Sequence, residues 1–247
     1  MHRKARTPSS ALRPSEACAA ELIAGGAHIA IPSKQPLGEL TNAPVKEYAQ
    51  TASPAEIDAE EADLIQWAKR NHRLFPTEEI EEFENHAPPK GGGSEHDAWK
   101  IEPENGAVVI RRTINDSYGF RFSSPFQYLR RMAEFSAQVP VAAIRFLGVS
   151  LNKRGNGVIW TVQPYIEGTH LTQAELVADL RLQGWRPAGS QHNHLVFEHA
   201  ASGIRIHDVH AGNFIRRKNG DLVPIDVFFE NIPQIDDFPP QPYPPQP

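Results

Sequence analysis

The sequence predicts an α+β protein in which one folded region is flanked by poorly ordered ends. Three observations predict this: helix-capping sequences before amphipathic segments, Asn-Gly turns between short apolar runs, and an uneven distribution of proline. The 247 residues include 22 prolines, 7 of them in the last 15 positions, whereas proline averages about 5% of residues. Strand-like and helix-like segments do not alternate regularly, which favours α+β over a parallel βαβ sheet.

The two ends differ in composition from the middle of the chain. Residues 1–52 contain scattered prolines and no sustained periodicity, so we expect a disordered or loosely attached segment. Residues 233–247 are expected to form polyproline II, either as a simple terminus or as a ligand for an aromatic-lined recognition module. Between the ends we expect a helical lead-in at 53–86, a sheet with one helix at 87–168, and a smaller part at 169–232.

Composition excludes several classes of protein. Cys18 is the only cysteine, which excludes a disulfide scaffold. No apolar run approaches the ~18 residues of a membrane helix. The net charge of −5 gives no general attraction to nucleic acid. The basic N-terminal residues are not followed by the apolar core of a signal peptide, so we expect a cytoplasmic protein with no membrane partner.

Helices are expected where a capping residue precedes an amphipathic pattern. Ser53 and Thr172 each stand three residues before a glutamate, which is the spacing of a capping box, and Ser124 is available as a third cap. The expected helices cover residues 54–70, 77–84, 125–137 and 173–182.

Strands are expected in apolar runs that are separated by turn residues, and the Asn-Gly pair at 105–106 is the strongest hairpin signal. The expected strands cover residues 98–101, 107–113, 144–151, 158–162, 195–198, 214–217 and 222–227. The polar segment Arg205–Asn213 is expected to be a loop between strands.

This polar loop carries the residues with the clearest chemistry. Phosphoryl transfer from a nucleotide needs an acid that orients or deprotonates the attacking hydroxyl, together with oxygen ligands for Mg2+. Asp208 and Asn213 supply an acid and an amide oxygen five residues apart. The hairpin that follows returns Asp226 to the same end of the sheet, so we expect one acidic cup that faces a triphosphate.

The same residues resemble a known family. The segment DVHAGN, followed by a strand, an Asn-Gly turn and Pro-Ile-Asp, resembles the catalytic and metal-binding loops of the protein-kinase-like superfamily in their aminoglycoside-phosphotransferase style. More specifically, the chain is similar to the small kinase domain of phage and mobile-element polyvalent proteins. The stretches that carry this resemblance lie between Ala62 and Asn231 and include GGGSEHDAWKI, VVIRRT, YLRRM, TVQPYIEG and HDVHAGNFIRRKNGDLVPIDV.

The resemblance implies a compact bilobal kinase-like fold, with residues 87–168 as the N-lobe and residues 169–232 as a minimal C-lobe. It also implies ATP and Mg2+ as cofactors and an unidentified phosphoacceptor as partner. Asp208 would be the catalytic acid, Asn213 and Asp226 would bind the magnesium ion, and His210 would orient the loop or contact phosphate.

The resemblance also assigns residues to the nucleotide. Arg111 would stand where the family has a phosphate-holding lysine, with Arg112 as a second possibility. Because the two alternate along a strand, at most one faces the nucleotide, and the other is expected to be solvated. Glu134 would be the acidic partner of this arginine. The nucleotide-covering loop would be formed by Gly91, Gly92, Gly93 and Ser94. The hinge would be formed by Gln163 to Tyr165.

Two other functions remain open from the sequence. The missing lysine and the short C-terminal part allow a nucleotide-binding pseudokinase or interaction module. The five histidines between His192 and His210 allow a zinc hydrolase. Its ligands would come from His192, His194, His199, His207 and His210 together with Asp208.

Overall fold

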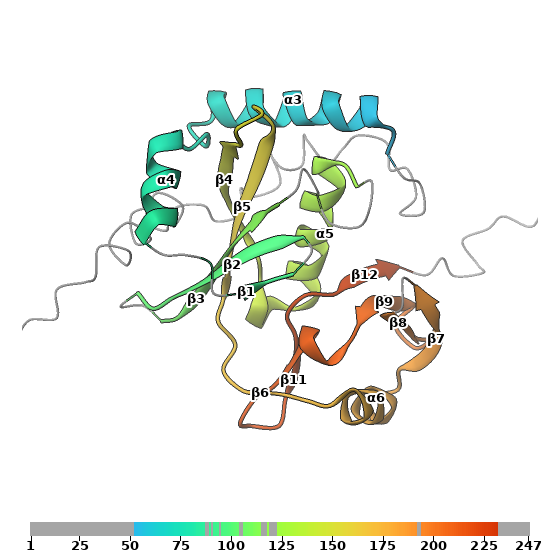
Figure 1. Cartoon of the computed structure of the whole chain (residues 1–247). Helices are drawn as coiled ribbons and strands as arrows, with labels where there is room; N and C mark the ends of the chain where they lie inside the picture. Colours follow the sequence, from blue (N-terminus) through green and yellow to red (C-terminus); the bar gives the residue numbers. More distant parts are fainter. Residues whose placement is uncertain are drawn as a thin grey trace, which may run out of the picture. The chain divides into compact units, whose positions relative to one another are not determined.

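A five-stranded antiparallel sheet in the order β1-β2-β3-β5-β4 forms the centre of the first part of the computed structural model (Figure 1). The structure describes residues 52–86, 89, 91–93, 95–103, 106–114, 118, 123–191 and 194–231. The strands of this sheet are β1 (Gly91–Gly92), β2 (His96–Ile101), β3 (Val108–Thr113), β4 (Arg145–Leu151) and β5 (Gly157–Pro164). Helix α5 (Pro125–Gln138) and a short 3-10 helix, η1 (Pro140–Ala142), stand between β3 and β4 in the chain.

Helices α3 (Pro54–Arg70) and α4 (Thr77–His86) precede this sheet. In α3 the Ser53 hydroxyl accepts from the Glu56 amide at 3.3 Å, and the Glu56 carboxylate accepts from the Ser53 amide at 2.9 Å, which completes the capping box. Glu61 accepts from the Gly157 amide at 3.0 Å. Helix α3 is thereby held at the turn end of the β4–β5 hairpin, as Figure 1 shows.

Aromatic side chains fill the core beside α4. The Trp99 and Trp160 rings are stacked, with centroids 5.5 Å apart and planes at 23°. The Phe83 ring of α4 contacts both, at 5.3 and 5.9 Å. All three side chains are buried, so this cluster fixes α4 against the sheet.

The remainder of the chain forms two smaller antiparallel sheets, in the orders β12-β9-β8-β7 and β11-β10-β6. Helix α6 (Gln173–Leu182) follows β6 and begins with the capping box of Thr172 and Glu175. The strands are β6 (Thr169–His170), β7 (Arg186–Gln191), β8 (His194–His199), β9 (Ile204–Val209), β10 (Phe214–Arg216), β11 (Leu222–Pro224) and β12 (Phe228–Asn231). A short 3-10 helix, η2 (Ala211–Asn213), separates β9 from β10.

The α+β class is confirmed, and all four expected helices are present with ends within two residues of the prediction. The expectation of a loop over Arg205–Asn213 is wrong at its beginning, because Ile204–Val209 forms β9. The strand expected over 222–227 ends at Pro224, and a separate strand, β12, pairs with β9. The expectations for 1–51, 87–88 and 232–247 lie outside the described residues.

The chain divides into two compact units. The first contains residues up to Met132 together with Ile144–Tyr165, and the second contains Ala133–Ala143 and the residues from Ile166 onward. Among the described residues, no helix has both the length and the apolar character needed to cross a membrane.

A glycine in β4 permits a close backbone approach in the first unit. The Arg73 carbonyl accepts from the Val149 amide at 2.8 Å, and the Phe75 amide donates to the Val149 carbonyl at the same distance. A Cβ atom at Gly148 would lie 2.6 Å from the Arg73 carbonyl oxygen and 2.8 Å from the Phe75 ring. The segment after α3 therefore docks on β4 only because residue 148 has no side chain.

We expect Gly148→Ala to destabilise the protein by about 1–3 kcal/mol, since the added methyl group has to displace backbone. The midpoint of urea unfolding measures this change. Gly93→Ala is the control, because its Cβ would meet no atom within 4 Å. An equal midpoint for the two variants would contradict the close approach.

Candidate functional site

The candidate site is built on a bulge where β9 meets β8. The pairs Leu195–Val209 and Phe197–Ile206 enclose one more residue on β9 than on β8. Asp208 lies in this bulge with φ 61°, a left-handed conformation that L-residues other than Asn and Asp seldom adopt. Bulges re-aim side chains and occur often beside active sites. The sheet therefore places the Asp208 side chain in a direction that a regular strand would not give it.

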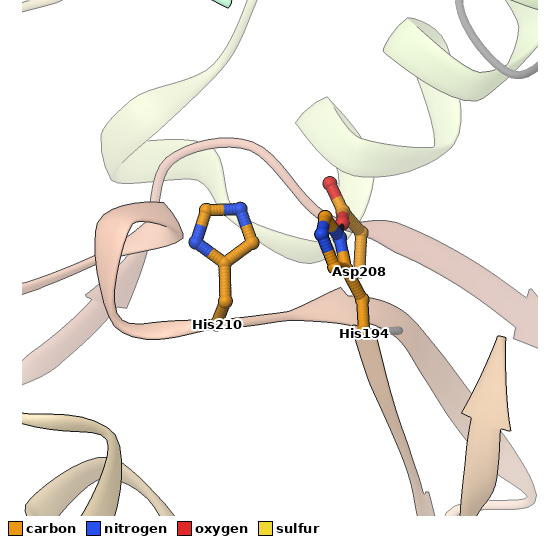
Figure 2. A group of neighbouring side chains, drawn as sticks. All are labelled: His194, Asp208 and His210. Atoms are coloured by element: carbon orange, nitrogen blue, oxygen red, sulfur yellow. Dashed lines mark hydrogen bonds and ion pairs between the residues drawn. The ribbon is translucent and has the colours of Figure 1, made fainter. Parts of the chain in front are cut away.

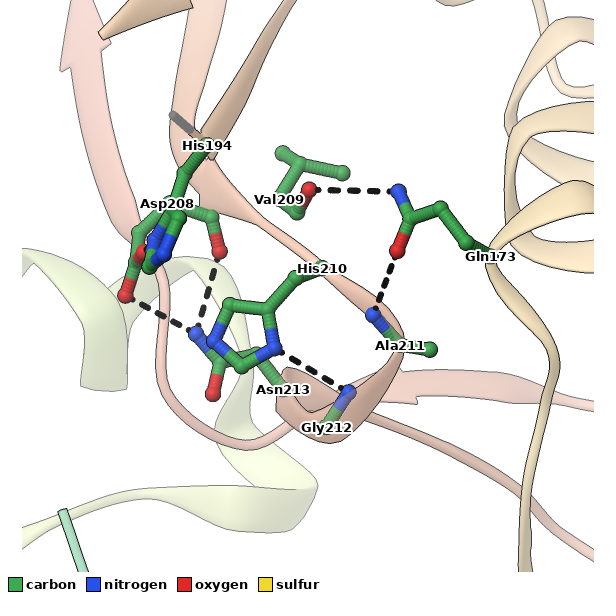
Figure 3. A network of polar contacts seen from close by, with 8 residues as sticks. All are labelled: Gln173, His194, Asp208, Val209, His210, Ala211, Gly212 and Asn213. Atoms are coloured by element: carbon green, nitrogen blue, oxygen red, sulfur yellow. Dashed lines mark hydrogen bonds and ion pairs between the residues drawn. The ribbon is translucent and has the colours of Figure 1, made fainter. Parts of the chain in front are cut away.

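Two side chains bind the Asp208 carboxylate (Figure 3). The Asn213 amide nitrogen, Nδ2, donates to Asp208 Oδ2 at 2.9 Å and to the Asp208 backbone carbonyl at 3.0 Å. The His194 Nδ1 atom forms a hydrogen bond with Asp208 Oδ1. Both carboxylate oxygens are thus engaged, and the orientation of the carboxylate is determined by β8 and η2.

The turn from His210 to Asn213 is held from two sides. The His210 ring nitrogen Nδ1 accepts from the Gly212 amide at 3.1 Å and caps η2. From the first residue of α6, the Gln173 side chain accepts from the Ala211 amide at 2.8 Å and donates to the Val209 carbonyl at 3.4 Å. Figure 3 shows that Gln173 reaches across to the turn from α6. These bonds keep the turn in one conformation.

Asp226 returns to this turn as the hairpin predicts. Phe214 pairs with Pro224 in the β10–β11 ladder, and the Ile225 amide donates to the Asn213 carbonyl at 2.8 Å. Burial lowers the pKa of the His210 imidazole, and the Asp226 carboxylate partly offsets this shift by raising it. The carboxylate therefore lies close enough to His210 to act on it electrostatically.

Asn213 and Asp226 carry the types of oxygen that Mg2+ binds in proteins. Asn213 is buried and its Nδ2 is directed to Asp208, so its remaining side-chain polar atom is Oδ1. Among the residues that the structure describes, none donates a hydrogen bond to this oxygen. An amide oxygen and one carboxylate, completed by phosphate and water, form the kind of shell that Mg2+ prefers.

His194, Asp208 and His210 also form a group whose possible ligand atoms lie within 4.8 Å of one another (Figure 2). A transition metal needs an unprotonated nitrogen from each histidine. Because Nδ1 of His210 accepts from Gly212, the proton of the neutral ring is on Nε2. Binding through Nε2 of His210 would require loss of that proton, whereas a carboxylate bonded to Nδ1, as in His194, is common for metal-binding histidines. The zinc alternative therefore stays a prediction for these three residues.

Arg111 and Gln163 lie on the same face of the first sheet. Arg111 is buried, and its Nη2 donates to the Gln163 side chain. Gln163 of the predicted hinge is therefore bonded to Arg111. Tyr165, at the end of the same hinge, donates its amide to the Ala107 carbonyl at 2.9 Å. Tyr165 is partly exposed, with the Lys100 ammonium 4.1 Å from the centre of its ring.

The expectation that the second arginine of β3 is solvated is wrong. Arg112 is half-buried and binds Asp97 at 2.7 Å, and it also forms an ion pair with Glu84 of α4. Its guanidinium lies 5.4 Å from the Trp99 ring and 5.8 Å from the Trp160 ring. Arg112 therefore links α4 to β2 and β3, a contact between distant segments that strand alternation does not reveal.

The other predicted residues lie on several elements. Gly91 and Gly92 form β1 and pair with Ala98 and Asp97, and the Gly93 amide donates to the His96 carbonyl at 3.1 Å. Ser94 lies outside the described residues. Glu134 lies on α5, and its pairing with Arg111 stays a prediction.

Two of the remaining histidines bind elsewhere. His199 bonds the Ser202 hydroxyl at 2.8 Å and its ring contacts Trp185 at 5.1 Å, while His207 bonds Glu230 at 2.8 Å. His192 lies outside the described residues. The six-residue cluster of the zinc alternative therefore reduces to three residues in the part of the chain that the structure describes.

Two residues of the site, Gln173 and His194, carry no local sequence signal that assigns them to it. Gln173 was predicted only as part of a helix, although a polar side chain at a helix N-terminus can bind backbone outside the helix. His194 was considered only as a metal ligand or a strand-edge residue. Its contact with Asp208 depends on the β8–β9 pairing and on the bulge. No local sequence pattern predicts the pairing or the bulge.

Comparison with known families finds no family model that matches the chain, and comparison with curated proteins finds no significant match.

The backbone of Asp208 provides a test of the bulge. Asp208→Gly and Asp208→Ala both remove the carboxylate, but only glycine adopts φ 61° without strain. We expect the glycine variant to be more stable than the alanine variant by about 1 kcal/mol, measured by urea unfolding. Asp221 lacks a positive φ, so at this position the alanine variant should be more stable than the glycine variant. Equal stabilities at position 208 would count against a strained bulge.

The proximity of Asp226 and His210 is testable by NMR. Removing the negative charge with Asp226→Asn removes a contribution that raises the His210 pKa, so we expect this pKa to fall further. A pH titration of the histidine ring signals measures the change. Asp221→Asn, in the exposed β10–β11 turn, is the matched control and should leave the His210 pKa unchanged. An unchanged His210 pKa in Asp226→Asn would contradict the proximity of the two side chains.

Proposed function

We propose that the protein is an ATP- and Mg2+-dependent phosphotransferase that transfers the γ-phosphate to a hydroxyl acceptor. One observation carries this proposal: Asn213 binds the Asp208 carboxylate through Nδ2, while its backbone carbonyl binds Ile225 beside Asp226. This arrangement gathers an acid, an amide oxygen and a second carboxylate at one turn. Phosphoryl transfer depends on such positioning and on charge neutralisation more than on covalent chemistry.

Each residue then has a distinct task. Asn213 Oδ1 and the Asp226 carboxylate would hold Mg2+, which would neutralise charge on the transferred group. Asp208 would orient the acceptor hydroxyl. His210, a neutral ring with its proton on Nε2, would donate a hydrogen bond to a phosphate oxygen.

The order of elements from Gly91 to Tyr165 supports a kinase-like fold for this proposal. A glycine strand, β1, is followed by β3 with Arg111, by α5 with Glu134, and by β5, which ends beside Tyr165. This is the order in which the resemblance to the small kinase domain of polyvalent proteins assigns nucleotide contacts. The acceptor would be a hydroxyl group on a protein or on a small molecule.

A second candidate function is nucleotide binding without transfer, as in a pseudokinase. The buried position of Arg111 and its bond to Gln163 favour it, since a guanidinium held inside the sheet is not available to grip phosphates as a flexible lysine is. Under this hypothesis the protein binds Mg-ATP and releases no ADP.

A transfer assay decides between the two. The purified full chain is incubated with Mg2+ and ATP labelled at the γ-phosphate, with dephosphorylated casein as a hydroxyl acceptor, and both labelled protein and ADP are measured. We expect Asp208→Asn to lower transfer by roughly 10²- to 10⁴-fold, because Asn keeps the shape and the left-handed backbone but lacks the negative charge that the reaction needs at this position. Calorimetry with a non-hydrolysable ATP analogue measures binding separately.

Asp221→Asn, which removes an exposed carboxylate from the adjacent hairpin, is the control and should transfer at the original rate. Binding without transfer by the unaltered protein, with activity gained in Arg111→Lys, would select the pseudokinase. If the unaltered protein neither binds Mg-ATP nor transfers phosphate, both functions are excluded.

A further inference from the structure

His194 is a site residue that lies outside the DVHAGN segment. It is the first residue of β8, and it contacts the site only because β8 pairs with β9. Figure 2 shows its ring beside the Asp208 carboxylate, with the His210 ring facing the pair from the turn. The structure therefore adds a histidine to a site that the motif alone describes with an aspartate and an asparagine.

The hydrogen bonds define how His194 is protonated. An ionised carboxylate can only accept, so the bond between His194 Nδ1 and Asp208 Oδ1 places the ring proton on Nδ1. The lone pair of the neutral ring is then on Nε2. Asn213 holds the other carboxylate oxygen at 2.9 Å, so the carboxylate cannot turn away from the ring. This is the arrangement in which a carboxylate orients a histidine base.

Exposure separates the roles of the two residues. The His194 side chain is 45% exposed, whereas the Asp208 side chain is 21% exposed. An acceptor that arrives from solvent therefore reaches the imidazole more readily than the carboxylate. The His210 ring lies edge-to-face against His194, with centroids 4.9 Å apart, and further restricts the orientation of the ring.

We propose that His194 is the general base of the transfer reaction and that Asp208 acts as its positioning residue. This inference rests on the proposed phosphotransferase function. The Nε2 atom of His194 takes the proton of the acceptor hydroxyl while the acceptor oxygen bonds to the γ-phosphorus. The bond from the γ-phosphorus to the bridging oxygen breaks, ADP leaves with the electron pair, and His194 later releases the proton to water.

The charges around His194 suit this role. Asp208 of β9 is negative and stabilises the imidazolium that forms when the proton arrives. His210 of the turn accepts from the Gly212 amide through Nδ1, which a neutral ring allows, and burial lowers the pKa of this imidazole. A neutral His210 does not oppose a positive charge on the adjacent ring. Asp226 acts on His210 and adds a further negative charge to the same region.

The experiment uses the full chain, Mg2+, γ-labelled ATP and dephosphorylated casein, and it compares His194→Gln with His194→Ala. Glutamine can still donate to Asp208 but cannot take a proton. We expect both variants to lose at least about 10²-fold in transfer while their affinity for a non-hydrolysable ATP analogue stays unchanged. Added imidazole should restore activity to His194→Ala, and substituted imidazoles of greater basicity should restore more.

His199→Ala is the matched control, because His199 lies on the same strand and bonds Ser202 away from the site. Its transfer rate should equal that of the unaltered protein. Full activity in His194→Gln, or a loss in His194→Ala that imidazole does not restore, would overturn the general-base role and leave the phosphotransferase function standing. Absence of transfer in the unaltered protein would overturn both. If the unaltered protein binds one equivalent of zinc and both His194→Ala and His210→Ala lose it, the general-base role is overturned and His194 is a metal ligand.

Discussion

The arrangement of the polar site in the second unit depends on the hydrogen bonds of one residue, Asn213. Its side-chain Nδ2 donates to both the carboxylate and the backbone carbonyl of Asp208, and its backbone carbonyl accepts from the Ile225 amide. Three segments that are separate in sequence are thereby tied at a buried position, where an unmade hydrogen bond would cost about 1–3 kcal/mol. The same bonds determine which atoms remain for chemistry, since they leave Oδ1 of Asn213 for a cation and direct the Asp208 carboxylate towards His194.

The elements of the fold that could be predicted are those whose signals are local. The capping boxes at Ser53 and Thr172 and the glycines at 106 and 155, both with positive φ, marked helix starts and hairpin turns within a few residues of their observed places. Strand β9 was missed because Arg205, His207 and Asp208 give it the polarity of a loop. Those side chains have partners from β8 and β12, so pairing in the sheet, which is a non-local property, overrides the local composition.

The candidate site was predictable to a similar extent. The segment from Asp208 to Asp226 has a spacing that a single hairpin brings together, and the Asn213–Ile225 bond shows this return. The contributions of His194 and Gln173 depend on a bulge and on a helix placed beside the turn, so neither could be recognised from spacing. The role of Arg112 was misjudged for the same reason, since its partner Glu84 lies 28 residues away in the chain.

The stacked pair of Trp99 and Trp160 has a consequence for spectroscopy. Two indoles with centroids 5.5 Å apart and planes at 23° are electronically coupled, which gives their absorption bands a circular dichroism signal that disappears when they separate. The chain has four tryptophans, and three of them, Trp67, Trp99 and Trp160, belong to the first unit, while Trp185 belongs to the second and contacts His199. The exciton signal therefore reports on the sheet that holds Arg111, and Trp185 contributes fluorescence from the unit that holds Asp208.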